Sequence, residues 1–479
     1  MLSARHRNKR YVSTGRPAAP SRRPGDRAAT SARPGVVPVS AGASTGHALT
    51  QGDENARLYD YERSVKEAFD SIVPTLKKIS ALQHEPGFES QAQRLARQYL
   101  GFELPSALLQ DAWVDQLDMR SLFAWCVFET YHRFCDEVFT SDPLGDKCEA
   151  QFQALLQDCG FHLLDVSPCA DGRLAHVIRY VLRLPYKAVR RRSYAGAMFD
   201  IDDSLEKWVK TELKRFREGQ PNTADEPTRY LKAVVYHHSS VDPEHEGCAA
   251  HGSDTQKAAQ GGLDRLTGFR QAVENTHCCG ASIDSLLIGM DTDTDAIRIH
   301  MPSADGGVDL ESYIDSQVVY DKTAHMNAGR AGQWIIEHIR ERGGENLDDG
   351  MGRFIAYLLT NNLSQVEYVR NYYGGHYSDI GHAERFIGAG IGFEEVQLRN
   401  LTFFAYMNTV EEAATDLDVG IRIFTGLNVS HGLPVPIVVR FDYHGKVPGA
   451  RERAEQHCQR VSDALHARYR ELSDRGLLH

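Results

Sequence analysis

Two short segments of this 479-residue sequence hold side chains that could do chemistry. The first contains Cys169, Asp171 and Arg173 within five residues, and the second contains the adjacent His237 and His238, followed by Cys248. An arginine close to an aspartate can keep the carboxylate ionised and oriented, because a guanidinium donates two parallel hydrogen bonds. Zn²⁺ favours mixed sulfur and imidazole ligands, and a catalytic zinc has three protein ligands and one open position. The two segments together therefore predict a catalytic zinc site.

Each of these segments follows a predicted β-strand. Residues 162–166 and 230–236 are short runs rich in apolar residues, typical of buried strands. Helical patterns over residues 174–184 and 202–218 lie between them. Strands that alternate with helices indicate an α/β sheet with parallel strands, whose carboxyl ends meet at one edge where sites form. We therefore expect the two segments to lie close together in the fold.

The remaining sequence predicts four parts and an α/β (α+β) fold class overall. We expect a disordered tail over residues 1–52, a helical domain over 53–150, an α/β catalytic domain over 151–385 and a second α/β unit over 386–479. Further strands are expected at 285–289, 296–299, 401–406, 419–424 and 437–441, and further helices at 334–342, 354–361 and 450–472.

The charge is divided unevenly along the chain. Residues 1–50 contain eight Arg, one Lys, one Asp and five Pro, so they carry +8, whereas the whole chain carries −11 and the rest therefore −19. A basic, proline-rich segment without large apolar side chains cannot bury enough surface to fold. We interpret it as an idle tail or as a tether for an acidic protein surface, in which residues 5–11 form a short recognition element.

Composition also excludes several classes of protein. A folded part of charge −19 would repel phosphates, which disfavours a nucleic-acid partner. Mean hydropathy is −0.42 and no run of about 18 apolar residues exists, so we expect no membrane span. Nine cysteines are too few for a disulfide scaffold, and the first residues lack the apolar core of a secretory signal. A reducing compartment is expected.

The pattern Cys-x-Asp-x-Arg after one strand, with His and Cys after the next, resembles the β-class carbonic anhydrases. Their later pair is His-x-x-Cys, whereas nine or ten residues separate His and Cys here. That departure resembles the carboxysomal shell carbonic anhydrases, a divergent β-class group once set apart as an ε class. Residues 237–254, 273–282, 291–298 and 382–388 are similar to that group as well, and the resemblance covers nearly the whole chain.

The resemblance implies one zinc ion per chain, held by Cys169, Cys248 and one histidine. The β-class strand-end pattern favours His238, whereas the longer insertion before the cysteine favours His237, which we adopt. Carbonic anhydrases are the standard example of a zinc ion that lowers the pKa of its bound water toward about 7. The resemblance implies that a zinc-bound hydroxide would attack CO₂ to give bicarbonate. It also implies that Asp171 would orient this hydroxide and that Arg173 would hold Asp171.

The resemblance also implies a place in the cell and partners. It implies a bacterial enzyme inside the carboxysome that supplies CO₂ to Rubisco, and a basic tail that binds Rubisco or another shell or interior protein. Chains of this family pair into homodimers or larger homo-oligomers. The C-terminal unit lacks Cys-x-Asp-x-Arg, so the resemblance implies a degenerate copy of the catalytic domain without a site of its own.

Two other classes of protein compete with this interpretation. A structural zinc scaffold would need a fourth protein ligand, which His245 or His251 could provide, but it would not need a fixed Asp171 beside the metal. A zinc hydrolase or deaminase would carry His-Glu-x-x-His or Pro-Cys-x-x-Cys, and neither is present. For an enzyme, His245, His251 and His382 are candidate proton relays.

Three further motifs are interpreted as structural segments that bind no metal ion or nucleotide. Residues 277–279, His-Cys-Cys, fit a helix end or core better than a second metal site. The acidic segment 291–295 lacks the Gly and distal Glu of a calcium loop and is expected to connect two strands. The Gly-rich segment 388–392 lacks the Lys-Ser/Thr of a phosphate loop, so no nucleotide is expected.

Overall fold

The computed structural model describes residues 46–110, 116–140, 142–145, 147–174, 176–220, 222–223, 227–276, 281–303, 307–377, 387–391, 404–406, 409–411, 414, 417–418, 420–421, 435–441 and 443–479. It contains both helices and sheets, which confirms the predicted fold class. None of the helices in these ranges is both long and apolar enough to cross a membrane.

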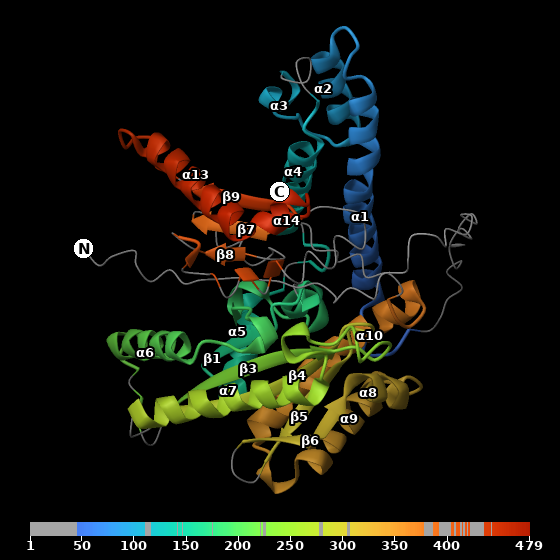
Figure 1. The fold of residues 1–479 in the computed structure, drawn as a ribbon. Helices are drawn as coiled ribbons and strands as arrows, with labels where there is room; N and C mark the ends of the chain where they lie inside the picture. The colour runs from blue at the N-terminus through green and yellow to red at the C-terminus, as the bar shows by residue number, and fades with distance from the viewer. Residues whose placement is uncertain are drawn as a thin grey trace.

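The N-terminal helices build a core of their own. Helices α1 (Gly52–Ala81) and α4 (Met119–Thr140) run side by side, while α2 (Phe88–Tyr99) and α3 (Ser106–Gln110) lie at the end of α1 that points away from the large sheet (Figure 1). Oδ1 of Asp118 accepts hydrogen bonds from the backbone amides of Arg120 and Ser121 and so caps α4, which begins at Met119. The predicted helical pattern is confirmed.

The large sheet has six strands in the order β2-β1-β3-β4-β5-β6. The first four are parallel, as expected, and β5 and β6 extend the sheet in antiparallel fashion. Burial on both faces explains why β3 is an almost continuous apolar run. The strands are β1 (Leu163–Pro168), β2 (Arg190–Arg191), β3 (Thr228–His238), β4 (Ala281–Asp291), β5 (Ile297–Pro302) and β6 (Val308–Asp315).

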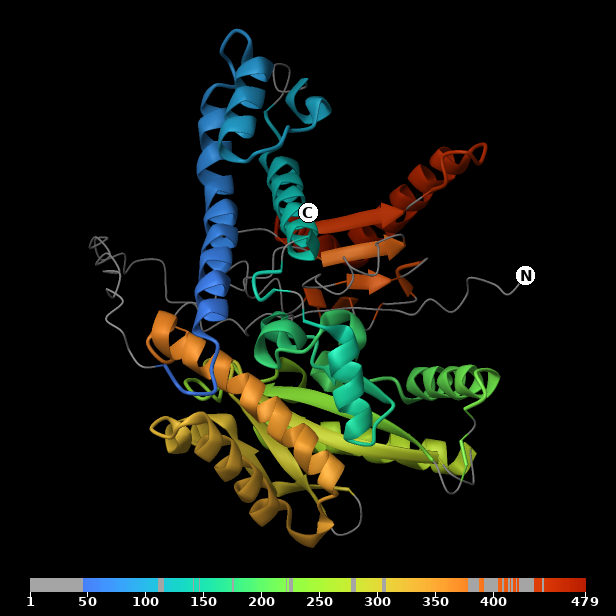
Figure 2. The same cartoon turned by 180° about the vertical axis from the view of Figure 1, so that it is seen from behind.

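Helices cover both faces of this sheet. Figure 2 shows α5 and α10 in front of the sheet, whereas α7 lies in front of it in the opposite view of Figure 1. Phe269 of α7 packs edge-on against Tyr230, and Phe354 of α10 packs edge-on against Phe161. The helices of this part are α5 (Glu149–Asp158), α6 (Ile201–Arg217), α7 (Thr255–Thr276), α8 (Ser316–Thr323), α9 (Ala328–Gly343) and α10 (Asp349–Tyr373).

Short helical turns complete this domain. The stretch 174–184, expected to be one helix, contains a 3₁₀ turn and a short π-helix instead. The turns are η3 (Gly172–Leu174), η4 (Val177–Val181), η5 (Tyr186–Ala188), η6 (Ala195–Ala197), η7 (Ala249–His251) and η8 (Gly344–Asn346).

The C-terminal part contains a three-stranded parallel sheet in the order β8-β7-β9. Its strands are β7 (Ile387–Ile391), β8 (Phe404–Tyr406) and β9 (Ile437–Phe441), and they are followed by α13 (Ala450–Arg468) and α14 (Arg470–Asp474). The prediction of a strand over residues 419–424 is wrong for residues 420–421, the part of this range that the structure describes. Leu417 and Ile421 lie four residues apart in helical turns and pack into one core, which is the spacing of a helix face.

Most of the predicted tail, residues 1–45, lies outside the described residues. The end of that segment is ordered, which corrects the expected boundary at residue 52. His47 is buried: its backbone amide donates to Glu367 Oε1 at 2.8 Å, and its Nε2 lies 2.8 Å from Thr323 Oγ1. These contacts to α8 and α10 offset the ordering entropy that composition alone leaves uncompensated.

Candidate metal centre

Two neighbouring parallel strands bring the first two candidate ligands to one sheet edge. Pro168 at the end of β1 pairs with Val235 of β3, and the amide of Cys169 donates to the Val235 carbonyl at 2.8 Å. Cys169 therefore continues the line of β1, and His237 lies two residues further along β3. The shared direction of the strands is the reason that these side chains meet.

A tight turn after β3 supplies the third candidate. The carbonyl of Cys248 accepts hydrogen bonds from the amides of His251 and Ser253, at 3.0 and 2.9 Å. A Cβ atom on Gly247 would lie only 2.6 Å from the Ser253 carbonyl oxygen, so this turn requires glycine immediately before the cysteine. The turn directs Cys248 back toward the sheet edge.

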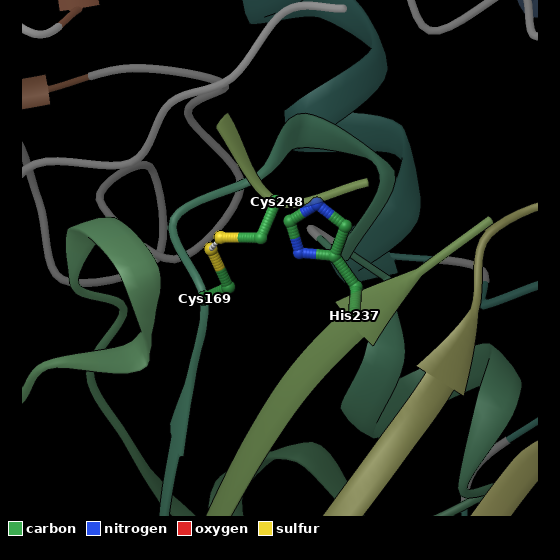
Figure 3. Close-up of side chains that lie close together, drawn as sticks. All are labelled: Cys169, His237 and Cys248. Atoms are coloured by element: carbon green, nitrogen blue, oxygen red, sulfur yellow. Dashed lines mark hydrogen bonds between the residues drawn. The ribbon is translucent and has the colours of Figure 1, made fainter. Parts of the chain in front are cut away.

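Cys169, His237 and Cys248 form one buried cluster. Their potential ligand atoms all lie within 4.8 Å of one another, and the two sulfurs are 3.7 Å apart. Figure 3 shows the two thiol groups and the imidazole ring turned toward one another. It is the one group of three or more such side chains found among the described residues.

The donor set and one orphaned atom fit a metal ion. Nε2 of His237 lies 2.9 Å from Asp171 Oδ2, whereas Nδ1 is buried and has no hydrogen-bond partner. A buried imidazole nitrogen without a partner is costly, and a metal ion would satisfy it. Two sulfurs and one imidazole nitrogen are also the ligand types that zinc favours.

Asp171 lies beside the cluster and is held by Arg173. Arg173 donates from Nε to Asp171 Oδ1 and from Nη2 to Oδ2, each at 2.8 Å, and both side chains are buried. Burial opposes ionisation, but the charges of Arg173 and His237 outweigh it and hold the pKa of Asp171 well below its usual value. The site therefore contains an ionised carboxylate of fixed orientation next to the three candidate ligands.

The protons on the candidate ligands respond to the same surroundings. Burial opposes the charge of His237, yet the ionised Asp171, which also accepts a hydrogen bond from the ring, raises the pKa of His237 to about 9. Burial, together with the neighbouring Cys248, raises the pKa of the Cys169 thiol well above its usual value. Without a metal, both groups hold protons at neutral pH.

His238 lies away from the cluster. Its Nδ1 is 3.4 Å from Nη2 of Arg298, and it lines a cavity of about 570 Å³ together with Arg298 and Arg370. Burial and the nearby positive charges, above all Arg298, lower the pKa of His238 to about 3. Successive residues of a strand point to opposite faces, so only one of the two histidines can face the cysteines.

The other candidate residues are not in the cluster. His245 is exposed and hydrogen-bonded to Asp242, and Nε2 of His251 donates to the Gly196 carbonyl. His382 and the motif 277–279 lie outside the described residues. The acidic segment 291–295 connects β4 and β5, as expected, and residues 388–391 belong to β7.

Sequence reasoning missed two partners of Arg173. Its Nη1 donates to the carbonyl of Glu246 at 2.9 Å and to Oγ1 of Thr292 at 3.0 Å. Thr292 follows β4, more than a hundred residues after Arg173, and no local signal in the sequence links the two.

Comparison with known proteins gives the family. Models of three parts of the carboxysome shell carbonic anhydrase match this chain: the N-terminal part over residues 47–139, the catalytic domain over 151–382 and the C-terminal part over 383–479. The chain belongs to the carboxysome shell carbonic anhydrase family. It is accordingly an enzyme of the carbonic anhydrase class that is located in the carboxysome.

Proteins called carboxysome shell carbonic anhydrase are similar to this chain over most of their length. The protein of Prochlorococcus marinus strain MIT 9313 is 54% identical over 99% of this chain and 94% of its own. That of Parasynechococcus marenigrum strain WH8102 is 58% identical over 90% of this chain and 76% of its own. The more distant protein of Halothiobacillus neapolitanus is 46% identical over 90% and 86%, respectively.

Proposed function

We propose that this carbonic anhydrase depends on one zinc ion per chain, held by Cys169, His237 and Cys248. The single observation that carries the proposal is the buried cluster of two sulfurs and an imidazole, with a partnerless Nδ1, beside an ionised carboxylate. Zinc bound there would act as a Lewis acid that makes hydroxide available from water near neutral pH.

Asp171 and Arg173 have distinct roles in the proposed reaction. The carboxylate of Asp171 accepts a hydrogen bond from the attacking oxygen and turns its lone pair toward CO₂. Oδ1 accepts from the amide and Nε of Arg173, whereas Oδ2 accepts from Nη2 of Arg173 and lies 2.9 Å from Nε2 of His237. The attacking oxygen would therefore take the position at Oδ2 that His237 Nε2 occupies in this structure. Arg173 keeps the carboxylate ionised and prevents it from rotating, so Asp171 is the catalytic residue and Arg173 the positioning residue.

The burial and pairing of Asp171 support an open catalytic site over a closed structural one. A closed zinc site needs a fourth protein ligand, and the cluster among the described residues contains three. His245 and His251 have other partners, and both oxygens of Asp171 are held by Arg173. The alternative of a structural zinc scaffold is therefore not favoured.

The experiment is stopped-flow CO₂ hydration on the purified chain, with zinc quantified in the same samples. Wild-type protein should hold about one zinc per chain. Cys169→Ala should lose zinc and activity together, whereas Asp171→Ala should keep zinc and lose activity. Cys126→Ala, at a buried cysteine in the helical core, is the matched control and should change neither. Wild-type protein that is active without zinc, or binds zinc and is inactive, would overturn the proposal.

We also propose that the enzyme supplies CO₂ to Rubisco and that its basic N-terminal tail, with charge +8, binds an acidic surface of Rubisco or of another carboxysome protein. Contacts of this kind weaken with salt. Binding of the full chain and of a chain without residues 1–45 to Rubisco, at low and high salt, tests this part. Equal binding by both chains would contradict a role of the tail.

The proposed domains are a tail, a helical domain over 53–150, a catalytic domain over 151–385 and a C-terminal unit over 386–479 that is a degenerate copy of the catalytic domain. A hydrophobic core in each of the three folded parts supports this division, and a small fourth cluster joins Leu58 of α1 to Tyr368 of α10. We further propose that chains associate into homodimers or larger homo-oligomers, and light scattering on the purified protein would measure this directly.

A further inference from the structure

The connection between β4 and β5, residues 291–295, has a role that its acidic composition does not indicate. Asp293 accepts hydrogen bonds from the amides of Ser240 and Val241, at 2.9 and 3.0 Å, at the start of the loop that ends in Cys248. Asp295 is buried and accepts hydrogen bonds from Gln365 and Tyr377, at 2.9 and 2.7 Å. The segment that begins with Thr292 is therefore anchored at two points directly after this residue.

The hydroxyl of Thr292 lies between the catalytic pair and β3. The side chain is 1% exposed, and Oγ1 donates to the carbonyl of His238 at 3.1 Å. A hydroxyl has one hydrogen, so the bond of 3.0 Å between Oγ1 and Arg173 Nη1 is one in which Thr292 accepts. The bond to His238 thus orients the lone pair that Arg173 uses.

Arg173 is held at both ends of its guanidinium. Nε and Nη2 bind the two oxygens of Asp171, while Nη1 binds the carbonyl of Glu246 and the hydroxyl of Thr292. Because the guanidinium is planar, the two bonds at Nη1 fix the plane in which the other two are made. A shift of this plane would rotate the Asp171 carboxylate out of line with the reacting oxygen.

We propose that Thr292 is a positioning residue of the carbonic anhydrase reaction and acts through Arg173 on Asp171. This inference rests on the proposed roles of Asp171 and Arg173. The Thr292 hydroxyl is separable from the local fold, because the backbone amide of Thr292 donates to the same His238 carbonyl at 2.9 Å. Loss of the hydroxyl therefore leaves that carbonyl satisfied and removes one acceptor from Arg173.

The test compares three substitutions by stopped-flow CO₂ hydration, with zinc content and melting temperature measured on the same preparations. Thr292→Val keeps the shape and removes the hydroxyl, and we expect kcat to fall about tenfold with a change of less than about twofold in KM, because a buried N–H loses its acceptor. Thr292→Ser restores the hydroxyl and should stay within about twofold of wild type. Zinc content should be unchanged in both.

Thr294→Val is the matched control in the same segment. The hydroxyl of Thr294 donates to Asp291 Oδ2 at 2.8 Å and has no contact with Arg173, so we expect wild-type kcat. If Thr292→Val does not fold, Thr292→Ala takes its place, and the comparison with Thr292→Ser is made in the same way.

Three outcomes would overturn the inference. One is a kcat within twofold of wild type in the variants without the hydroxyl; another is an equal loss in Thr292→Ser; the third is loss of zinc together with activity, which would place the hydroxyl in the metal site instead. Failure of the proposed function is distinguishable, because it would be seen in the wild-type protein as activity without zinc or as zinc without activity.

Discussion

Arg173 binds both oxygens of the Asp171 carboxylate, at 2.8 Å each, and His237 Nε2 lies 2.9 Å from one of them. The carboxylate thus connects the arginine, which fixes its charge, to a candidate zinc ligand. This arrangement makes the aspartate a fixed acceptor that its neighbours hold in place. The predictions below test this pair, the choice of histidine, the protons on the ligands and the ion pair beneath the site.

Replacement of Arg173 by lysine should impair turnover and spare the metal. A lysine ammonium retains the positive charge but cannot make two parallel bonds to a carboxylate, so Asp171 would rotate. We expect kcat of Arg173→Lys to fall about 10- to 100-fold, which is the loss expected when a catalytic carboxylate is misplaced. Zinc content should be unchanged. Arg340→Lys, at an exposed ion pair, is the control. Near-normal turnover of Arg173→Lys would show that charge alone suffices.

The two adjacent histidines should respond differently to removal. His237→Ala removes one candidate ligand of three and should reduce bound zinc, after dialysis against a chelator, to a small fraction of the wild-type content. His238→Ala should retain wild-type zinc, because His238 lies beside Arg298, away from the sulfurs. Metal analysis by mass spectrometry measures both. Zinc lost only from His238→Ala would reverse the assignment.

Zinc affinity of the metal-free protein should rise with pH. In that state burial opposes the charge of His237, but the ionised Asp171 raises its pKa to about 9, so below pH 9 zinc must displace a proton from the imidazole. The Cys169 thiol, whose pKa is raised well above its usual value, gives up a second proton. We expect at least a tenfold gain in apparent affinity per pH unit between pH 6.5 and 8.5, measured by competition with a chromophoric chelator.

The same raised pKa fixes the pH dependence of stability in the metal-free protein. The folded state holds the proton on His237 more tightly than the unfolded chain does. Its contribution to stability is therefore complete below the unfolded pKa of about 6.5 and is lost as pH rises through about 9. Denaturant titrations of metal-free His237→Ala should lack this contribution, and an identical pH dependence in both proteins would contradict the assignment.

The buried ion pair beneath the site should affect the free energy of unfolding. Replacement of one partner should destabilise the protein more than replacement of both. Nζ of Lys232 lies 3.0 Å from Asp165 Oδ1 and 2.9 Å from Ser167 Oγ, and both charged side chains are buried. Lys232→Met leaves a buried carboxylate without its cation, and we expect a loss of about 3–5 kcal/mol in the free energy of unfolding. Asp165→Leu combined with Lys232→Met should recover much of that loss.

Urea titrations monitored by circular dichroism measure these differences. The control is Lys210→Met, at an ion pair with Glu206 on the exposed face of α6, which should change stability by less than about 0.5 kcal/mol. If Lys232→Met were as stable as the wild type, the pair would be irrelevant to folding. A double variant less stable than Lys232→Met would mean that Asp165 is needed for another reason, such as its bond from Tyr230.

Local sequence patterns were sufficient to predict which side chains could form the site and to place them at the ends of two strands. A strand pattern depends on alternation and apolar runs within a few residues, so β1 and β3 could be recognised and Cys169 and His237 placed after or at their ends. The same locality explains the error at 419–424, where β-branched residues favour a strand but Leu417 and Ile421 pack as one helix face.

Contacts between distant parts of the chain could not be read in this way. Alternation shows that His237 and His238 point to opposite faces, but the return path of the loop carrying Cys248 determines which face has the sulfurs. Likewise, Thr292 reaches Arg173 only because β3 and β4 pair in a register that places His238 beside Asp291. Register and loop paths are set by packing over the whole sheet, and the residues in contact carry no local record of it.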